Sequence, residues 1–147
     1  MLTRYERFTA AVFGIGRSIR RIEGEEMKFH GLKGSHAPFL VVLYKNPDGV
    51  TATKLCDVCA KDKAAVSRAL AEMEEKGVVK KESVINYRAR LTLTEKGKEI
   101  AAAVCRRVED VVSVAEKNLP PELREPVFRA LDLIADDLNA IQIENVK

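Results

Sequence analysis

The sequence predicts a mainly α-helical protein with a small β-hairpin, in which a winged helix-turn-helix is flanked by long helices. Apolar residues recur every three or four positions along most of the chain, as they do on one face of an α-helix. Residues 89–94 instead alternate apolar with polar side chains, as a half-buried strand does. Two short helices joined by a sharp turn and followed by a hairpin make a winged helix, a shape that can lay a helix in a DNA major groove.

Composition indicates one domain, or two small units that share a core, in 147 residues. The chain is 46% hydrophobic and 32% charged, which is typical of globular proteins. No apolar run approaches the length of a membrane span, and the first residues do not resemble a secretory signal. Three cysteines, an odd number, indicate a reducing compartment, so we expect a cytoplasmic protein.

The N-terminal part predicts two helices. The spacing of apolar residues from Leu2 to about Arg21 favours a long helix with one apolar stripe. The polar segment 24–34 is expected to form turns. Ser35 is then expected to cap a second helix that tolerates Pro38 in its first turn. Phe39, Leu40 and Leu43 would point inward, and residues 46–49 (Asn-Pro-Asp-Gly) would form a turn.

Residues 51–77 predict the helix-turn-helix. Thr51 and Asp62 are the expected N-caps of its two helices, because their side-chain oxygens can accept bonds from free backbone N–H groups. Ala60 and Lys61 would form the turn between them, and Gly77 would end the second helix in a left-handed conformation. The expected inner faces contain Leu55, Cys56 and Cys59 on the first helix and Val66, Leu70 and Met73 on the second.

The remainder predicts a hairpin and two further helices. Val78 and Val79 begin one strand, and residues 89–94 form the other. Thr94 would cap a long helix that ends before Pro120, and the last helix would begin at the Pro-Pro pair. The apolar stripes of these helices are Ile100, Val104, Val108, Val111 and Ala115, then Val127, Leu131, Ile134, Leu138 and Ile141.

Three long amphipathic helices around a small winged helix leave apolar stripes without cover, which favours a two-fold dimer. We expect residues 1–34 and 95–147 to form the dimerisation region and residues 35–94 to form the DNA-binding domain. The alternative is that these stripes pack within one chain. The residues expected at the dimer interface are Tyr5, Phe8, Val12, Ile15, Val127, Leu131, Ile134 and Leu138.

The run DKAAVSRALAEMEEKGVVKK, followed by NYRARLTLTEKGKEI, resembles the winged-helix core of MarR-type bacterial transcriptional regulators. The similarity extends along the whole chain in the order of its helices. It implies a homodimer that binds a pseudo-palindromic operator, commonly a repressor released by a small aromatic or phenolic ligand. Charge agrees with this resemblance. Residues 51–97 contain ten Lys and Arg but seven Asp and Glu, so they carry the whole formal surplus of +3.

Candidate DNA-binding residues lie on the second helix of the pair and on the hairpin. Arg68 is the first choice for a base or phosphate contact, because its planar fork grips either one. On the resemblance, Arg88 would be the wing-tip arginine that enters the minor groove, although Asn86 stands where an Asp is usual. Ala60 likewise replaces a usual Gly. The other candidates are Thr53, Lys63, Ala64, Ser67, Lys80, Lys81 and Arg90. The alternative for all of these residues is that they only form part of a solvated surface and do not bind DNA.

Other chemistries find little support in the sequence. No phosphate loop, nucleophile elbow or metal-ligand cluster is present, so we expect no enzyme, no catalytic residue, no metal and no cofactor. Cys56 and Cys59 form a lone C-x-x-C that favours core packing over redox sensing or zinc binding. A winged helix used only for protein contacts remains the main rival. His30, His36, Tyr5 and Arg17 could line an effector crevice, but their spacing does not single them out.

Overall fold

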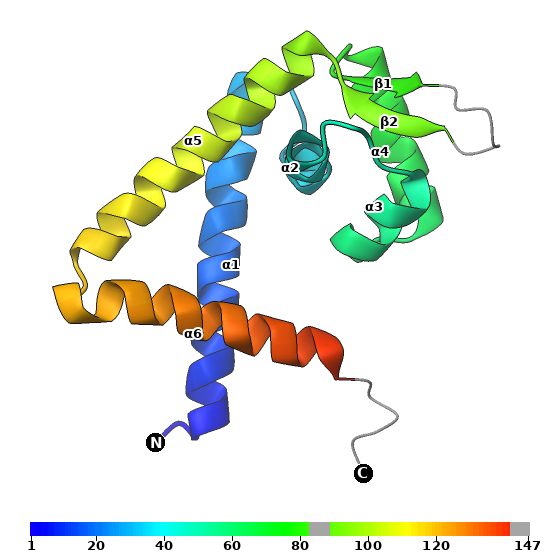
Figure 1. Ribbon diagram of the computed structural model, residues 1–147. Helices are drawn as coiled ribbons and strands as arrows, with labels where there is room; N and C mark the ends of the chain where they lie inside the picture. The colour runs from blue at the N-terminus through cyan, green and yellow to red at the C-terminus, as the bar shows by residue number, and fades with distance from the viewer. Residues whose placement is uncertain (83–88, 142–147) are drawn as a thin grey trace. The chain divides into compact units, whose positions relative to one another are not determined.

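The computed structural model describes residues 1–82 and 89–141. It divides into two units, Met1–Glu109 and Asp110–Lys147, each described below by itself. The elements in chain order are α1 (Arg4–Phe29), the 3-10 helix η1 (Gly34–His36), α2 (Ala37–Lys45), α3 (Ala52–Cys59), α4 (Lys63–Glu75), β1 (Val79–Glu82), β2 (Arg90–Leu93), α5 (Glu95–Lys117) and α6 (Pro121–Ala140) (Figure 1). The fold is mainly α with a two-stranded antiparallel hairpin, as predicted.

Helix α1 is longer than the sequence predicted. Thr3 and Glu6 form a capping box at its start, and the helix continues to Phe29 through residues that we expected to form turns. Gly24 lies inside the helix, and Gly34 crosses it closely. A Cβ built on Gly34 would lie 2.9 Å from the Gly24 Cα, whereas one built on Gly24 would lie 3.6 Å from the Gly34 Cα. The crossing therefore requires a glycine at position 34, and Gly24 does not end the helix.

The predicted N-cap at Ser35 is wrong. Ser35 lies inside the 3-10 turn η1, and the N-cap of α2 is His36, which makes no side-chain capping bond. The predicted inner face is confirmed, since Phe39, Leu40 and Leu43 are all buried.

The helix-turn-helix forms as predicted. Thr51 Oγ1 accepts a bond from the Lys54 N–H at 3.2 Å, and Asp62 Oδ1 accepts one from the Ala65 N–H at 2.7 Å. The apolar stripe of α4 is buried, and Gly77 follows the helix with φ of +73°. Ala60 makes the turn in the left-handed region, with φ of 50° and ψ of 47°. On α3, Leu55 is fully buried and the two cysteines are half-buried against the core.

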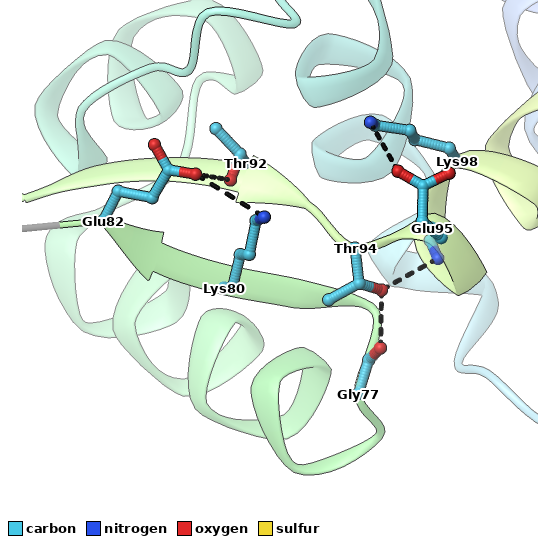
Figure 2. A network of polar contacts seen from close by, with 8 residues as sticks. Gly77, Lys80, Glu82, Thr92, Thr94, Glu95 and Lys98 are labelled. Atoms are coloured by element: carbon cyan, nitrogen blue, oxygen red, sulfur yellow. Dashed lines mark hydrogen bonds and ion pairs between the residues drawn. The ribbon is translucent and has the colours of Figure 1, made fainter.

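The hairpin pairs Val79 with Leu93 and Glu82 with Arg90. Thr92 was expected to face solvent, but its side chain is buried and its hydroxyl lies 3.4 Å from Glu82 Oε1 (Figure 2). The hydrogen bond to Glu82 satisfies the buried hydroxyl.

The first part of α5 joins the core beside the hairpin. Thr94 Oγ1 accepts a bond from the Gly97 N–H at 3.1 Å and donates one to the Gly77 carbonyl at 2.6 Å (Figure 2), which confirms the predicted cap. Gly97 packs on the Val78 carbonyl so closely that an added Cβ would lie 2.1 Å from its oxygen. Ile100, Ala101 and Val104 are buried further along the helix.

The second unit contains the end of α5 and the whole of α6, which begins at the Pro-Pro pair as predicted. Arg124 donates to the Lys117 and Leu119 carbonyls at 3.3 Å each, which helps to satisfy the end of α5. No residue of α6 is buried. Among the described residues, no helix is both long and apolar enough to cross a membrane.

Candidate nucleic-acid interface

The outer surface of α4 is the candidate reading surface. One side of the helix packs against the core through the buried residues Val66, Leu70 and Met73. The four predicted contact residues of this helix, Lys63, Ala64, Ser67 and Arg68, are all exposed. Three of their side chains can donate or accept hydrogen bonds or carry charge, and the short Ala64 lets a neighbouring surface approach the helix closely.

Two separate grooves border this surface. The first, about 600 Å³, lies between α3, α4 and the hairpin. Thr53, Lys63, Ser67 and Lys81 line it, so four predicted DNA-binding residues from three elements meet in one hollow. The floor includes Leu70 and Leu91 of the core.

The second groove, about 240 Å³, lies on the opposite flank of α4. It contains Arg68, and its other cations are Lys61 of the helix-turn-helix turn and Lys33 before η1. The structure therefore separates Arg68 from Lys63 and Ser67, which the sequence had grouped together. Nothing in the spacing along one helix could show this, because the second groove is completed by residues some thirty positions earlier in the chain.

The hairpin lysines are paired with acids. Lys80 Nζ lies 3.6 Å from Glu82 Oε1, and Lys81 Nζ lies 3.4 Å from Glu74 Oε1. All four side chains are substantially exposed, so each pair contributes roughly 0–1 kcal/mol and exchanges readily for another anion. The predicted wing-tip residue Arg88, with Asn86, lies outside the described residues.

Arg90 has a structural contact that the sequence did not reveal. Its Nη1 donates to the Gly49 carbonyl at 3.1 Å and lies 3.5 Å from the Asp48 carbonyl. The guanidinium thereby joins β2 to the turn that precedes α3. Arg90 remains exposed, so a DNA contact by its other donors stays a prediction.

Comparison with known proteins agrees with this arrangement. A family model described as "MarR family" matches residues 30–86, which run from the end of α1 through η1, α2 and the helix-turn-helix to the hairpin. Many MarR-family structures superpose on most of the chain. Residues 30–86 are thus similar to the MarR family, and the fold of MarR-type structures extends over most of the chain.

Three solved MarR-type structures indicate how far the likeness extends. A MarR family transcriptional regulator from Listeria monocytogenes complexed with 26mer DNA is 24% identical, with TM-score 0.77, over 88% of this chain and 87% of that one. A MarR regulator from Methanosarcina mazei Go1 is 21% identical, with TM-score 0.83, over 96% and 95%. NadR in complex with 4-hydroxyphenylacetate is 16% identical, with TM-score 0.77, over 97% and 99%. The sequence matches no curated protein.

An ion-pair cluster that sequence reasoning missed supports the winged helix beside the second groove. Lys33 Nζ lies 2.8 Å from Glu72 Oε2, and His36 Nε2 lies 3.8 Å from the same oxygen. The hydrogen bond from Lys33 lowers the pKa of Glu72, so this carboxylate stays ionised near neutral pH. Burial lowers the pKa of His36, an effect that the Glu72 charge opposes. The cluster joins the η1 region to the middle of α4.

The three cysteines are free and half-buried. Cys56 lines the first groove, and both Cys56 and Cys59 pack against the core. Burial raises the pKa of Cys59, with a smaller contribution from Cys56, so the thiol rather than the reactive thiolate predominates. Within residues 1–82 and 89–141, no group of three potential ligands is arranged to hold a metal ion.

The residues predicted to form the dimer interface remain largely uncovered. On α1, Tyr5 is 73% exposed and Ile15 is 54% exposed, with Phe8 and Val12 also open to solvent. On α6, Leu131, Ile134 and Leu138 are exposed, and Val127 is partly covered. Each helix thus presents an apolar stripe that its own unit does not bury.

Proposed function

We propose that this chain is a DNA-binding transcriptional regulator that acts as a homodimer on a pseudo-palindromic operator. In this proposal α4 enters the major groove and the hairpin reaches the minor groove, where the predicted wing arginine Arg88 would make the contact. The two reading helices of a dimer would then contact half-sites one helical turn apart, about 34–36 Å. The match to the MarR family model favours a regulator over an enzyme, and a regulator of this kind acts in the cytoplasm.

The observation that carries the proposal is the first groove. It brings Thr53, Lys63, Ser67 and Lys81 together beside the outer surface of α4. Hydroxyl groups and cations are the groups that bind base edges and phosphates. The Listeria relative was crystallised on DNA, which supports the same use of this surface here.

Dimerisation is supported by the uncovered stripes of α1 and α6. Their large apolar side chains lose contact with water only against another surface, and a two-fold dimer gives every stripe a partner. We therefore assign residues 1–34 and 95–147 to dimerisation and residues 35–94 to DNA binding.

A small aromatic or phenolic effector and a repressor role complete the proposal. NadR, with the same fold, binds 4-hydroxyphenylacetate, and this supports the ligand class. An effector releases DNA only if it binds the DNA-free arrangement more tightly than the DNA-bound one.

The test combines sedimentation with binding to a pool of random duplexes. We expect a dimer at micromolar concentration and affinity that falls steeply as salt rises. The double variant Lys63→Ala/Ser67→Ala should lose sequence preference, whereas Arg106→Ala, an exposed charge on α5, should not. A monomer, or a protein that ignores duplexes in dilute buffer, would refute the proposal.

One alternative has an observation in its favour. Cys56 lines the first groove, so oxidation of its thiol by peroxide to a sulfenic acid, with release of water, would add a polar group to the DNA surface. A redox-responsive regulator predicts that peroxide abolishes duplex binding and that Cys56→Ser prevents the loss. Unchanged binding after peroxide would leave the cysteines as packing residues. Use of the winged helix only for protein contacts is tested by the same duplex pool, which such a module would not bind.

A further inference from the structure

We propose that Arg68 grips the DNA backbone together with Lys61, and does not read a base. This inference rests on the proposed function and assigns a second contact surface to it. This surface is the second groove described above, on the flank of α4 away from the hairpin, and is named here the backbone groove. It is defined by Lys61, Arg68 and Ser35. The residues left to read bases are those of the first groove.

Placement on α4 is the first argument. Arg68 lines a hollow whose other walls are the η1 region and the turn between α3 and α4, with Phe39 and Ala69 at its apolar base. Arg68 shares this hollow with Lys61, on the flank of α4 away from the first groove, so a phosphate in the hollow would contact both side chains.

Charge is the second argument. The fixed anion in the backbone groove is Glu72, and Lys33 already holds it at 2.8 Å. His36 is neutral near pH 7, since burial lowers its pKa. Within residues 1–82 and 89–141, neither Lys61 nor Arg68 has a carboxylate within 4.0 Å. Two cations are thus left to face an incoming anion, and Ser35 adds an exposed hydroxyl donor.

Rigidity is the third argument. The Lys61 backbone N–H donates to the Cys56 carbonyl at 3.1 Å, and Asp62 caps α4 directly afterwards. The Lys33–Glu72 pair joins the opposite wall to α4. A phosphate bound across these elements would set the depth and angle of α4, because backbone contacts fix orientation without carrying sequence information.

The experiment compares Arg68→Ala, Lys61→Ala and Arg68→Lys with wild type on two probes. The probes are a random duplex pool and the duplex selected from it by the wild type. Arg7→Ala on α1 is the control for loss of one exposed positive charge. Thermal melting of each variant checks the fold.

We expect Arg68→Ala and Lys61→Ala to weaken binding to both probes by the same factor. Each lost phosphate contact, at a slope of about 0.9 and roughly 0.1 M salt, corresponds to about eightfold, so a dimer that loses one contact in each protomer should bind about 60-fold more weakly. The salt slope should become shallower by about one per protomer. Arg68→Lys should keep most of the salt slope, since a point charge still pairs with phosphate but cannot form the bidentate contact to guanine.

Three outcomes overturn the inference. If sequences reselected with Arg68→Ala prefer a different base from the wild type at any position, Arg68 reads that base. If Arg68→Ala binds both probes as tightly as Arg7→Ala does, Arg68 makes no contact with the DNA backbone. Loss of selectivity in Arg68→Lys would assign Arg68 to a base. A wild type that binds neither probe would instead refute the proposed function.

Discussion

Replacing Ala60 with glycine should stabilise the protein, although most substitutions destabilise one. Ala60 is the one described non-glycine residue with positive φ. A side chain in the left-handed region costs roughly 1–2 kcal/mol. Glycine avoids that strain but gives the unfolded chain more freedom, which costs about 0.4–1 kcal/mol. Ala60 is exposed, so removal of its methyl group loses little burial. The net expectation is about 0.5–1 kcal/mol of added stability.

Denaturant unfolding followed by circular dichroism measures this change, with all proteins at one concentration because dimerisation makes stability depend on it. The thermal midpoint should rise by about 1–4 °C for a chain of this size. Ala71→Gly is the matched control. Ala71 is exposed within α4, and the same replacement there should cost about 1 kcal/mol. If Ala60→Gly destabilises as much as Ala71→Gly, the strain argument is wrong.

Three further predictions address the fold and the hairpin. Gly97→Ala places a Cβ 2.1 Å from a backbone oxygen and should cost about 3 kcal/mol or more in denaturant unfolding. Gly14→Ala, where an added Cβ would lie 3.9 Å from the Arg17 guanidinium, should instead add about 0.5–1 kcal/mol, and equal effects would contradict this reasoning. Glu74→Gln frees Lys81 from its ion pair and should raise duplex affinity by about 1.5- to 5-fold, which corresponds to roughly 0.2–1 kcal/mol. Fluorescence anisotropy measures this affinity. Unchanged affinity would mean that Lys81 does not contact phosphate. Because burial lowers the pKa of His36, the unfolded chain binds its proton more tightly, so stability should fall as pH drops below about 6.5. His36→Gln should remove that part of the pH dependence, which urea titrations at several pH values would reveal.

Local rules predicted the helix-turn-helix well because its determinants lie within a few residues of one another. Asp62 caps α4 through the backbone three positions on, and Gly77 ends the helix through its own φ. The prediction failed where a distant contact decides the outcome. Gly24 looked like the start of a turn, yet it lies inside α1, where Gly34 packs against its backbone. Ser35 lost its expected capping role to the 3-10 turn formed at that crossing.

The candidate site shows the same division. Exposure of Lys63, Ser67 and Arg68 followed from the position of each residue relative to the buried stripe. Their division between two grooves did not, because η1 and the hairpin complete those grooves from elsewhere in the chain. The pairing of Lys81 with Glu74 was equally hidden, since it joins a strand to a helix.

The contact between β2 and the turn before α3 has a mechanical consequence. Val50 and Leu91 exchange two backbone hydrogen bonds, at 3.1 and 2.8 Å, and Arg90 adds a third bond to the Gly49 carbonyl. Thr51, the first residue after this junction, caps α3. A load applied to the base of the hairpin is thereby transmitted through three bonds to the start of α3. We therefore expect bending of the hairpin and tilting of the helix pair to be coupled, and a substitution that removes these bonds should let each move without the other.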